Sequence, residues 1–211
     1  MTDNRKAESG TYPHLVFTVH EPFIARFFLL LQQGVKIRRR VGCSVEAFLR
    51  KEIGASPETI EKIQSIMLDG KPVDDIGSAM IHDGSVLALS AAMPGLVGAT
   101  LRRGGALSSF RSGITYHEDA KACAPDEGWV KTKIFNLLMA ELGPGLLRKG
   151  VLLAAEDFLV FLEDHAQEFQ KGWTVRLDGR EVDIDRLRDE RSLRGAGQVM
   201  LSVSADTTHT G

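Results

Sequence analysis

The sequence has few cysteines and no long apolar run. Only two of its 211 residues are cysteine, Cys43 and Cys123, and they lack the close spacing of a metal-binding pair. Two cysteines are a poor disulfide framework, so we expect a reducing, cytoplasmic compartment. The most apolar segment, Phe23–Leu31, contains Arg26 and is far shorter than the roughly 20 residues that a membrane span needs. We predict that this segment belongs to a core or an interface and that the protein does not associate with membranes.

Motifs for catalysis and for cofactor or metal binding are also missing. The sequence has no P-loop, no G-x-G-x-x-G after a strand and no G-x-S-x-G, and its six histidines are scattered. We predict no catalytic residues, no metal site and no cofactor, and we consider an enzyme the less favoured class. The formal net charge of −2 does not indicate nucleic acid as a partner. The polar stretch Met1–Gly10 has no apolar segment, so we do not expect a signal peptide there.

An internal repeat is the most informative feature that is present. The stretch from Leu68 to Asp74, LDGKPVD, is nearly repeated from Leu177 to Asp183 as LDGREVD. One short match can arise by chance, so the flanking residues decide whether the chain is duplicated.

The flanks repeat in the same order as the LDG turns. VEAFL at 45–49 matches AEDFL at 155–159, and the two copies lie at nearly equal distances before their LDG turns. GSVLALSA at 84–91 parallels GQVMLSVSA at 197–205. We interpret the chain as a duplicated α+β unit, and the alternative is two unrelated α+β halves that share a common turn.

Local patterns predict the elements of each unit. Strands are expected at 15–19, 35–41, 66–68, 86–90, 129–135, 151–153, 174–177 and 199–204. Helical segments are expected from Pro22 to Gly34, after Ser44, after Ser56, at 136–142 and at 155–170. The sequence Gly143-Pro144-Gly145 is expected to end the helix at 136–142. This order predicts a mixed sheet packed on one main helix in each unit.

The repeated unit resembles the β-grasp, or ubiquitin-like, superfamily. The likeness rests on the turn Leu68-Asp69-Gly70 and on Asp83-Gly84-Ser85-Val86 at the start of the last strand. It is closest to the sulfur carriers, such as the small subunit of molybdopterin synthase and the thiamine-pathway carrier, which end in Gly-Gly. It implies two tandem β-grasp units, one at residues 11–98 and one at 128–206, joined by a linker at 99–127.

The chain ends differently from a sulfur carrier. Carrier chemistry uses a free C-terminal glycine carboxylate, whereas this chain ends His209-Thr210-Gly211. A ubiquitin-type tail, Leu101-Arg-Arg-Gly-Gly105, does occur, but Ala106 follows it. A carrier-like function therefore requires cleavage after Gly105, and a processed precursor is one alternative for the function.

The linker gives a second alternative. It is rich in glycine and arginine and has no acidic residue from Met93 to Gly113. Glycine lets main-chain N–H groups approach a ligand, and arginine offers a planar fork to phosphate or carboxylate. The candidate residues for binding an anion, a small molecule or a partner are Arg102, Arg103, Gly104, Gly105 and Arg111. The competing interpretation is a connector whose apolar residues dock on a neighbouring unit.

The strand predicted at 35–41 is strongly basic. Lys36, Arg38 and Arg40 alternate and share one face, while Arg39 breaks the apolar pattern of the other. We interpret this strand as having an exposed face whose charges resist aggregation, as charges do on edge strands. Taken together, the sequence favours a non-enzymatic protein-interaction or assembly module that binds another protein or itself.

Overall fold

The computed structural model describes residues 12–92, 95–105, 115–116, 126–165, 168, 173–187 and 189–206. The protein is mixed α+β, with one ten-stranded mixed sheet in the order β11-β10-β1-β12-β9-β2-β8-β7-β4-β5 and a two-stranded sheet of β3 and β6. The strands are β1 (His14–Val19), β2 (Val35–Val41), β3 (Cys43–Ser44), β4 (Ser65–Leu68), β5 (Lys71–Pro72), β6 (Met80–Ile81), β7 (Val86–Ser90), β8 (Asp126–Phe135), β9 (Val151–Ala154), β10 (Thr174–Leu177), β11 (Arg180–Glu181) and β12 (Gln198–Ala205). The helical segments are η1 (Glu21–Phe27), α1 (Phe28–Gln33), α2 (Val45–Ala47), η2 (Phe48–Ile53), α3 (Pro57–Lys62), α4 (Gly95–Leu101), α5 (Leu138–Lys149), α6 (Ala155–Asp164), α7 (Ile184–Leu187) and α8 (Arg191–Arg194).

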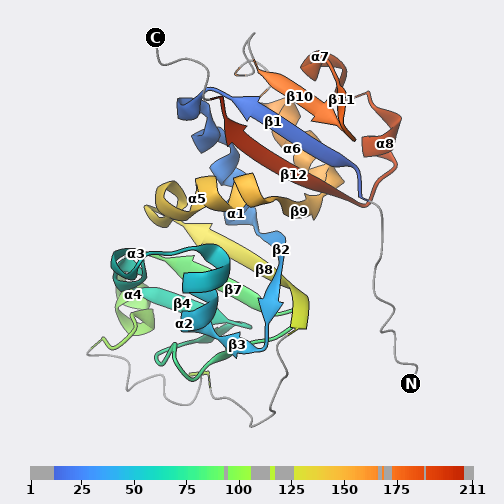
Figure 1. The fold of residues 1–211 in the computed structure, drawn as a ribbon. Helices are drawn as coiled ribbons and strands as arrows, with labels where there is room; N and C mark the ends of the chain where they lie inside the picture. The colour runs from blue at the N-terminus through green and yellow to red at the C-terminus, as the bar shows by residue number, and fades with distance from the viewer. Residues whose placement is uncertain are drawn as a thin grey trace.

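The large sheet consists of two lobes that exchange strands. The first lobe contains β2, β8, β7, β4 and β5, and the second lobe contains β9, β12, β1, β10 and β11. Strand β1, from the N-terminal part of the chain, lies between β12 and β10 in the second lobe. Strand β8, from the C-terminal part, lies between β2 and β7 in the first lobe. Figure 1 shows β8 among the first-lobe strands and β1 beside β12 in the other lobe.

The exchange makes each lobe depend on both sequence repeats. Each transferred strand is central in its lobe and pairs with one parallel and one antiparallel neighbour. The lobes join where β2 meets β9, at the pair Lys36 and Leu152. One sheet therefore runs through the whole molecule, and the two repeats contribute to it jointly.

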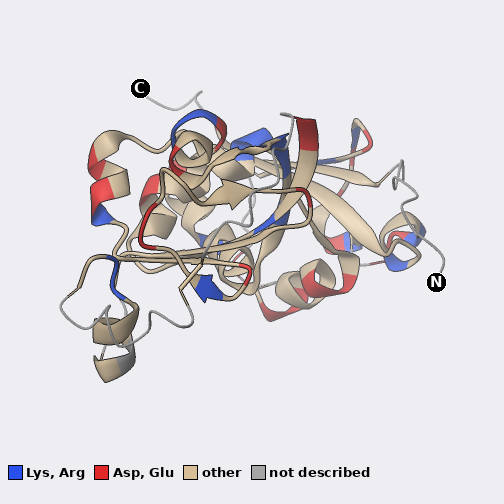
Figure 2. Cartoon of the chain, turned by 90° about the horizontal axis from the view of Figure 1, so that it is seen from below, with Lys and Arg blue, Asp and Glu red and all other residues tan. Residues whose placement is uncertain are grey.

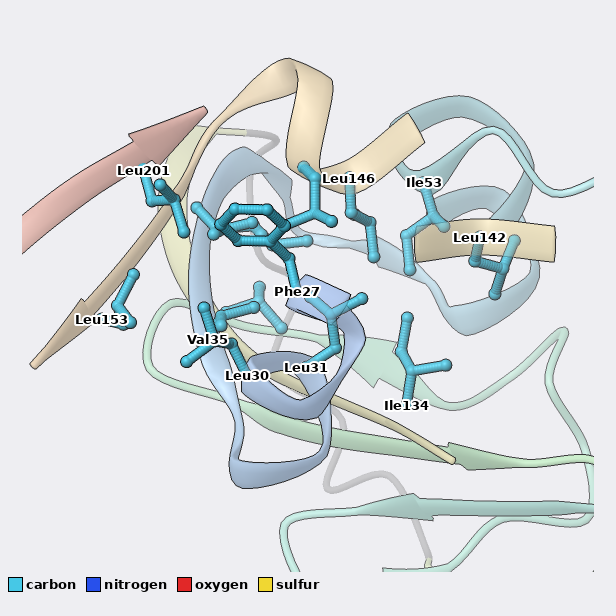
Figure 3. Close-up of a cluster of buried hydrophobic side chains, with 14 of the residues drawn as sticks. Phe27, Leu30, Leu31, Val35, Ile53, Ile134, Leu142, Leu146, Leu153 and Leu201 are labelled. Atoms are coloured by element: carbon cyan, nitrogen blue, oxygen red, sulfur yellow. The ribbon is translucent and has the colours of Figure 1, made fainter. Parts of the chain in front are cut away.

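The junction of the lobes is covered by α1 and α5 on the inner face of the sheet (Figure 1). Sequence patterns explain this cover, because the apolar segment 23–31 becomes η1 and α1 and buries Phe27, Leu30 and Leu31. This burial confirms the prediction that the segment belongs to a core or an interface. Figure 3 shows side chains from both lobes meeting there: Phe27, Leu30, Leu31, Val35, Ile53, Ile134, Leu142, Leu146, Leu153 and Leu201.

Most predicted boundaries follow from caps and turns. Ser44 Oγ accepts from the N–H of Ala47 at 3.2 Å, and Ser56 Oγ accepts from the N–H of Thr59 at 3.1 Å, so both serines cap helices as predicted. Asp69 and Asp178 each open their LDG turn with positive φ, at 51° in both cases. The two LDG turns therefore share one backbone geometry.

The predicted break at Gly143-Pro144-Gly145 is wrong. Helix α5 continues through Pro144 to Lys149. Proline removes one helical hydrogen bond, but tertiary packing holds the helix in place. A Cβ on Gly143 would lie 2.6 Å from Cε1 of Phe28, so the glycine allows α1 and α5 to approach closely instead of ending the helix.

The helix predicted at 155–170 is shorter in the structure. Its described part, α6, ends at Asp164, and residues 166–167 and 169–170 lie outside the described residues. None of the helices in the described ranges has the length and apolar character needed to cross a bilayer.

Candidate binding surface

The candidate surface lies on the outer face of the central strands, opposite α1 and α5. In β2 the buried residues Val35, Ile37 and Val41 point inward, so Lys36 and the exposed residues Arg38 and Arg40 point outward. This confirms the predicted alternation. The edge-strand explanation for these charges is wrong, because β2 is a central strand between β9 and β8.

Strand β8 extends this basic surface. In the antiparallel register Lys131 lies directly opposite Lys36, and Trp129 lies directly opposite Arg38. Opposed residues share one face, and Lys133 follows Lys131 on that face. We define the basic face as Lys36, Arg38, Arg40, Trp129, Lys131 and Lys133.

A glycine brings two of these lysines together. The position where a Cβ of Gly34 would lie is 2.9 Å from Lys131 Cε and 3.0 Å from Lys133 Cε and Cγ. The aliphatic stems of both lysines therefore lie over the bare backbone of Gly34, whose φ is 103°. Any larger residue at Gly34 would push these side chains apart.

The charges on the basic face are only partly neutralised. Arg38 Nε lies 3.1 Å from Glu127 Oε2, and both side chains are more than half exposed. Such an exposed ion pair contributes little to stability. Lys36, Lys131 and Lys133 make no side-chain ion pair or hydrogen bond with any residue in the described ranges. Like charges directly opposite one another on a sheet are destabilising, so the pair Lys36 and Lys131 costs the free protein stability.

The charge of the whole molecule does not explain this cluster. Figure 2 shows basic and acidic positions interspersed over the chain, in keeping with the net charge of −2. The basic face is therefore a local feature of the sheet surface.

A small pocket opens at the edge of the basic face. Tyr12 and Trp129 meet edge to face, with ring centroids 6.4 Å apart and an interplanar angle of 88°. The pocket has a volume of about 200 Å³. Its lining residues are Tyr12, Lys36, Asp83, Gly84, Trp129, Lys131 and Leu152.

Hydrogen bonds to the main chain of Trp129 fix the wall of the pocket that contains Asp83. Asp83 Oδ1 accepts from the N–H of Trp129 at 2.7 Å, and the N–H of Gly84 donates to the carbonyl of Trp129 at 2.8 Å. A Cβ on Gly128 would lie 2.8 Å from Asp83 Oδ1, so that glycine permits the contact. The DGS sequence thus has a structural role here, because it anchors the middle of β8.

Arg39, the exception in the strand pattern, faces the inner side. Its Nη1 donates to the carbonyl of Arg38 at 2.7 Å, while its Nε and Nη2 are buried without a hydrogen-bond partner among the described residues. Burial lowers the pKa of the guanidinium below its usual value, and the nearby carboxylate of Glu52 opposes that shift. Arg39 is therefore separate from the basic face.

The linker residues predicted to bind a ligand are placed differently. The N–H of Arg103 donates to the carbonyl of Gln64 at 2.7 Å, and its Nη2 donates to the carbonyl of Ile60 at 3.5 Å. The N–H of Gly104 donates to Asp74 Oδ1 at 3.3 Å, and that of Gly105 to the carbonyl of Arg102. Arg102 is exposed, and Arg111 lies outside the described residues. The described part of this loop is thus docked on the first lobe through its main chain.

The described residues offer little for metal or thiol chemistry. No group of three or more His, Cys, Asp or Glu side chains in the described ranges could hold a metal ion. Cys43 is half-buried and unpaired, and burial, followed by the negative charge of Glu52, raises the pKa of its thiol. The thiol is thus less readily ionised than an exposed one.

Sequence reasoning missed Trp129, Lys131 and Lys133 because they become neighbours of Lys36 only through the strand exchange. Their own alternation, W-V-K-T-K, was the available signal. Comparison with protein-family models, with curated proteins and with solved structures found no match.

Proposed function

We propose that the chain is a non-enzymatic interaction module, working in the cytoplasm, that binds a partner protein through the basic face. The main support for this proposal is that three lysines without acidic partners among the described residues gather on an open sheet face beside a tryptophan. Tryptophan is enriched at protein interfaces. Clustered charges of one sign favour a partner that presents the opposite charge, because complementary charge steers association and fixes orientation. A partner with an acidic surface would also relieve the repulsion between Lys36 and Lys131.

The tandem β-grasp architecture is part of this proposal. Each lobe packs a mixed sheet on a helix that begins within a repeated sequence block, η2 in the first lobe and α6 in the second. The matched geometry of the two LDG turns supports a duplication. In this proposal the duplicated units exchanged their first strands, which joined two small sheets into one broad binding surface.

The strand exchange disfavours the carrier-like alternative. Cleavage after Gly105 would leave β8 on one fragment while its neighbours β2 and β7 stay on the other. Release of a free glycine tail on a separate carrier would require the first lobe to lose its central strand. The fold thus favours an uncut chain.

The linker alternative has less support than the basic face. Of its candidate arginines, Arg103 already uses main-chain and side-chain donors on the carbonyls of Gln64 and Ile60. An anion site there would have to compete with these docking contacts. The lysines of the basic face have no such competing contacts among the described residues.

Charge reversal tests the proposed function. The variant Lys36→Glu, Lys131→Glu, Lys133→Glu should lose the partner that the wild-type protein captures from its native cell extract. The matched control, Lys51→Glu, Arg180→Glu, Arg186→Glu, reverses three exposed cations elsewhere and should retain that partner. Capture is measured by quantitative mass spectrometry.

Thermal unfolding shows that the reversed variant is folded. The variant replaces one directly opposed like-charge pair at positions 36 and 131 with another, so its stability should stay within about 1 kcal/mol of the wild type. Equal capture by all three proteins would exclude the basic face as the recognition surface. If the captured partner is the chain itself, then the same comparison identifies the face as a self-association surface.

A further inference from the structure

The pocket beside the basic face indicates what the partner presents. Its volume of about 200 Å³ is below the range of pockets that enclose a cofactor or a drug-sized ligand. Its walls include the rings of Tyr12 and Trp129 and the side chain of Leu152. This combination suits a single apolar or aromatic side chain, which is the usual anchor of a protein interface.

The lysines around the pocket determine which groups of the partner can lie next to that anchor. Lys36 and Lys131 line the pocket, and Arg38 and Lys133 lie next to them on the same face. Asp83, the acidic residue of the pocket, already accepts the N–H of Trp129. Positive charges outnumber negative ones around the pocket, so carboxylates are the complementary side chains for groups that flank the anchor.

We infer that the pocket beside the basic face binds an aromatic side chain from an acidic segment of the partner, with carboxylates on either side of that anchor contacting Lys36, Lys131 and Lys133. This inference rests on the proposed function, because it specifies the chemistry recognised by the same face. A single-stranded nucleic acid is the competing class of partner. It would require successive rings on which bases stack, whereas Tyr12 and Trp129 form one edge-to-face pair.

Tryptophan fluorescence gives a direct readout of the pocket. The chain has two tryptophans, and Trp173 packs against Phe23 and Phe27 away from the basic face. In a Trp173→Phe protein the emission of Trp129 alone reports binding. The probes are capped pentapeptides of sequence EEFEE, EEAEE and QQFQQ, together with a single-stranded oligothymidylate.

The peptide EEFEE should change the emission of Trp129 saturably. EEAEE lacks the anchor and QQFQQ lacks the charge, so each should bind at least about tenfold more weakly, which corresponds to about 1.4 kcal/mol. Exchange of Lys36 and Lys131 for methionine should weaken EEFEE by a similar factor. Exchange of Lys51 and Arg180 for methionine should not.

Three results would overturn the inference. They are no saturable binding of EEFEE at millimolar concentration, equal binding of EEFEE and EEAEE, and tighter binding of the oligonucleotide than of any peptide. Failure of the pocket and failure of the proposed function are distinguishable. If charge reversal abolishes capture of the partner but the peptides do not bind, then the proposed function stands and the inferred aromatic anchor is wrong.

Discussion

At the scale of single residues, buried polar groups without partners show where the folded protein loses stability. Thr132 lies on the inner face of β8 and is fully buried. Its Oγ1 has no hydrogen-bond partner within the described part of the chain. A buried hydroxyl without a partner loses its hydration and gains nothing in return.

The substitution Thr132→Val should therefore stabilise the protein. It replaces the hydroxyl with a methyl group of nearly the same shape, and we expect the free energy of unfolding to rise by about 1 kcal/mol. Urea denaturation at neutral pH measures the change. The control is Thr18→Val on the outer face of β1, where the side chain is half-exposed and the effect should be close to zero. A lower stability for Thr132→Val would show that the hydroxyl has a partner.

Residues that depend on local rules were predictable from the sequence. The helix caps Ser44 and Ser56 and the turn at Asp69 follow from chemistry within a few residues. The candidate site was harder to predict, because Lys131 lies far from Lys36 in sequence and meets it only through the pairing of β8 with β2. The sequence predicted the exposure of Arg38 and Arg40 but not their neighbours.

At the scale of elements, α3 and α5 are tied together by one carboxylate. Glu141 Oε2 accepts from Thr59 Oγ1 at 2.8 Å, and Glu141 Oε1 lies 2.7 Å from Lys62 Nζ. The hydrogen bond from Lys62, followed by that from Thr59, holds the pKa of Glu141 below its ordinary value of 4.5. The carboxylate thus joins a first-lobe helix to the helix at the lobe junction.

This lowered pKa predicts a pH dependence of stability. A carboxyl whose pKa is lower in the folded state stabilises the fold fully above the unfolded-state pKa, near 4.5, and loses that contribution as the pH falls through the folded-state pKa. Glu141→Gln should therefore be less stable than the wild type at pH 7, and the difference should shrink in acid. Denaturation curves at several pH values between about 7 and 3 measure it.

The control for this prediction is Glu163→Gln. Glu163 is an exposed carboxylate on α6 whose side chain makes no ion pair or hydrogen bond with any other described residue. Its substitution should give a small difference that stays the same across the pH range. A difference for Glu141→Gln that does not shrink in acid would contradict the assigned role of the carboxylate.

Helix α5 shows why element boundaries were only partly predictable. Gly143, Pro144 and Gly145 have low helix propensity, yet they lie within α5. Packing of Gly143 against Phe28 overrides that propensity, and this contact joins segments more than a hundred residues apart. Local patterns contain no information about such a contact.

At the scale of the whole molecule, the exchange of β1 and β8 is the organising feature. Local sequence patterns predicted both strands, and the internal repeat predicted two similar groups of elements. Consecutive strands usually pair with each other, so no sequence pattern predicts that either strand lies in the other lobe. The breadth of the sheet, and with it the basic face, follows from that exchange.

The most direct test of the account is to cut the chain after Gly105 under native conditions, through a protease site inserted there. The exchanged strands predict that fragments 1–105 and 106–211 stay together as a folded one-to-one complex, with the mass of the intact protein in native mass spectrometry. The complex should retain the sheet signal in circular dichroism and should separate only in denaturant. Two fragments that part spontaneously and remain folded on their own would contradict the strand exchange and the binding surface that depends on it.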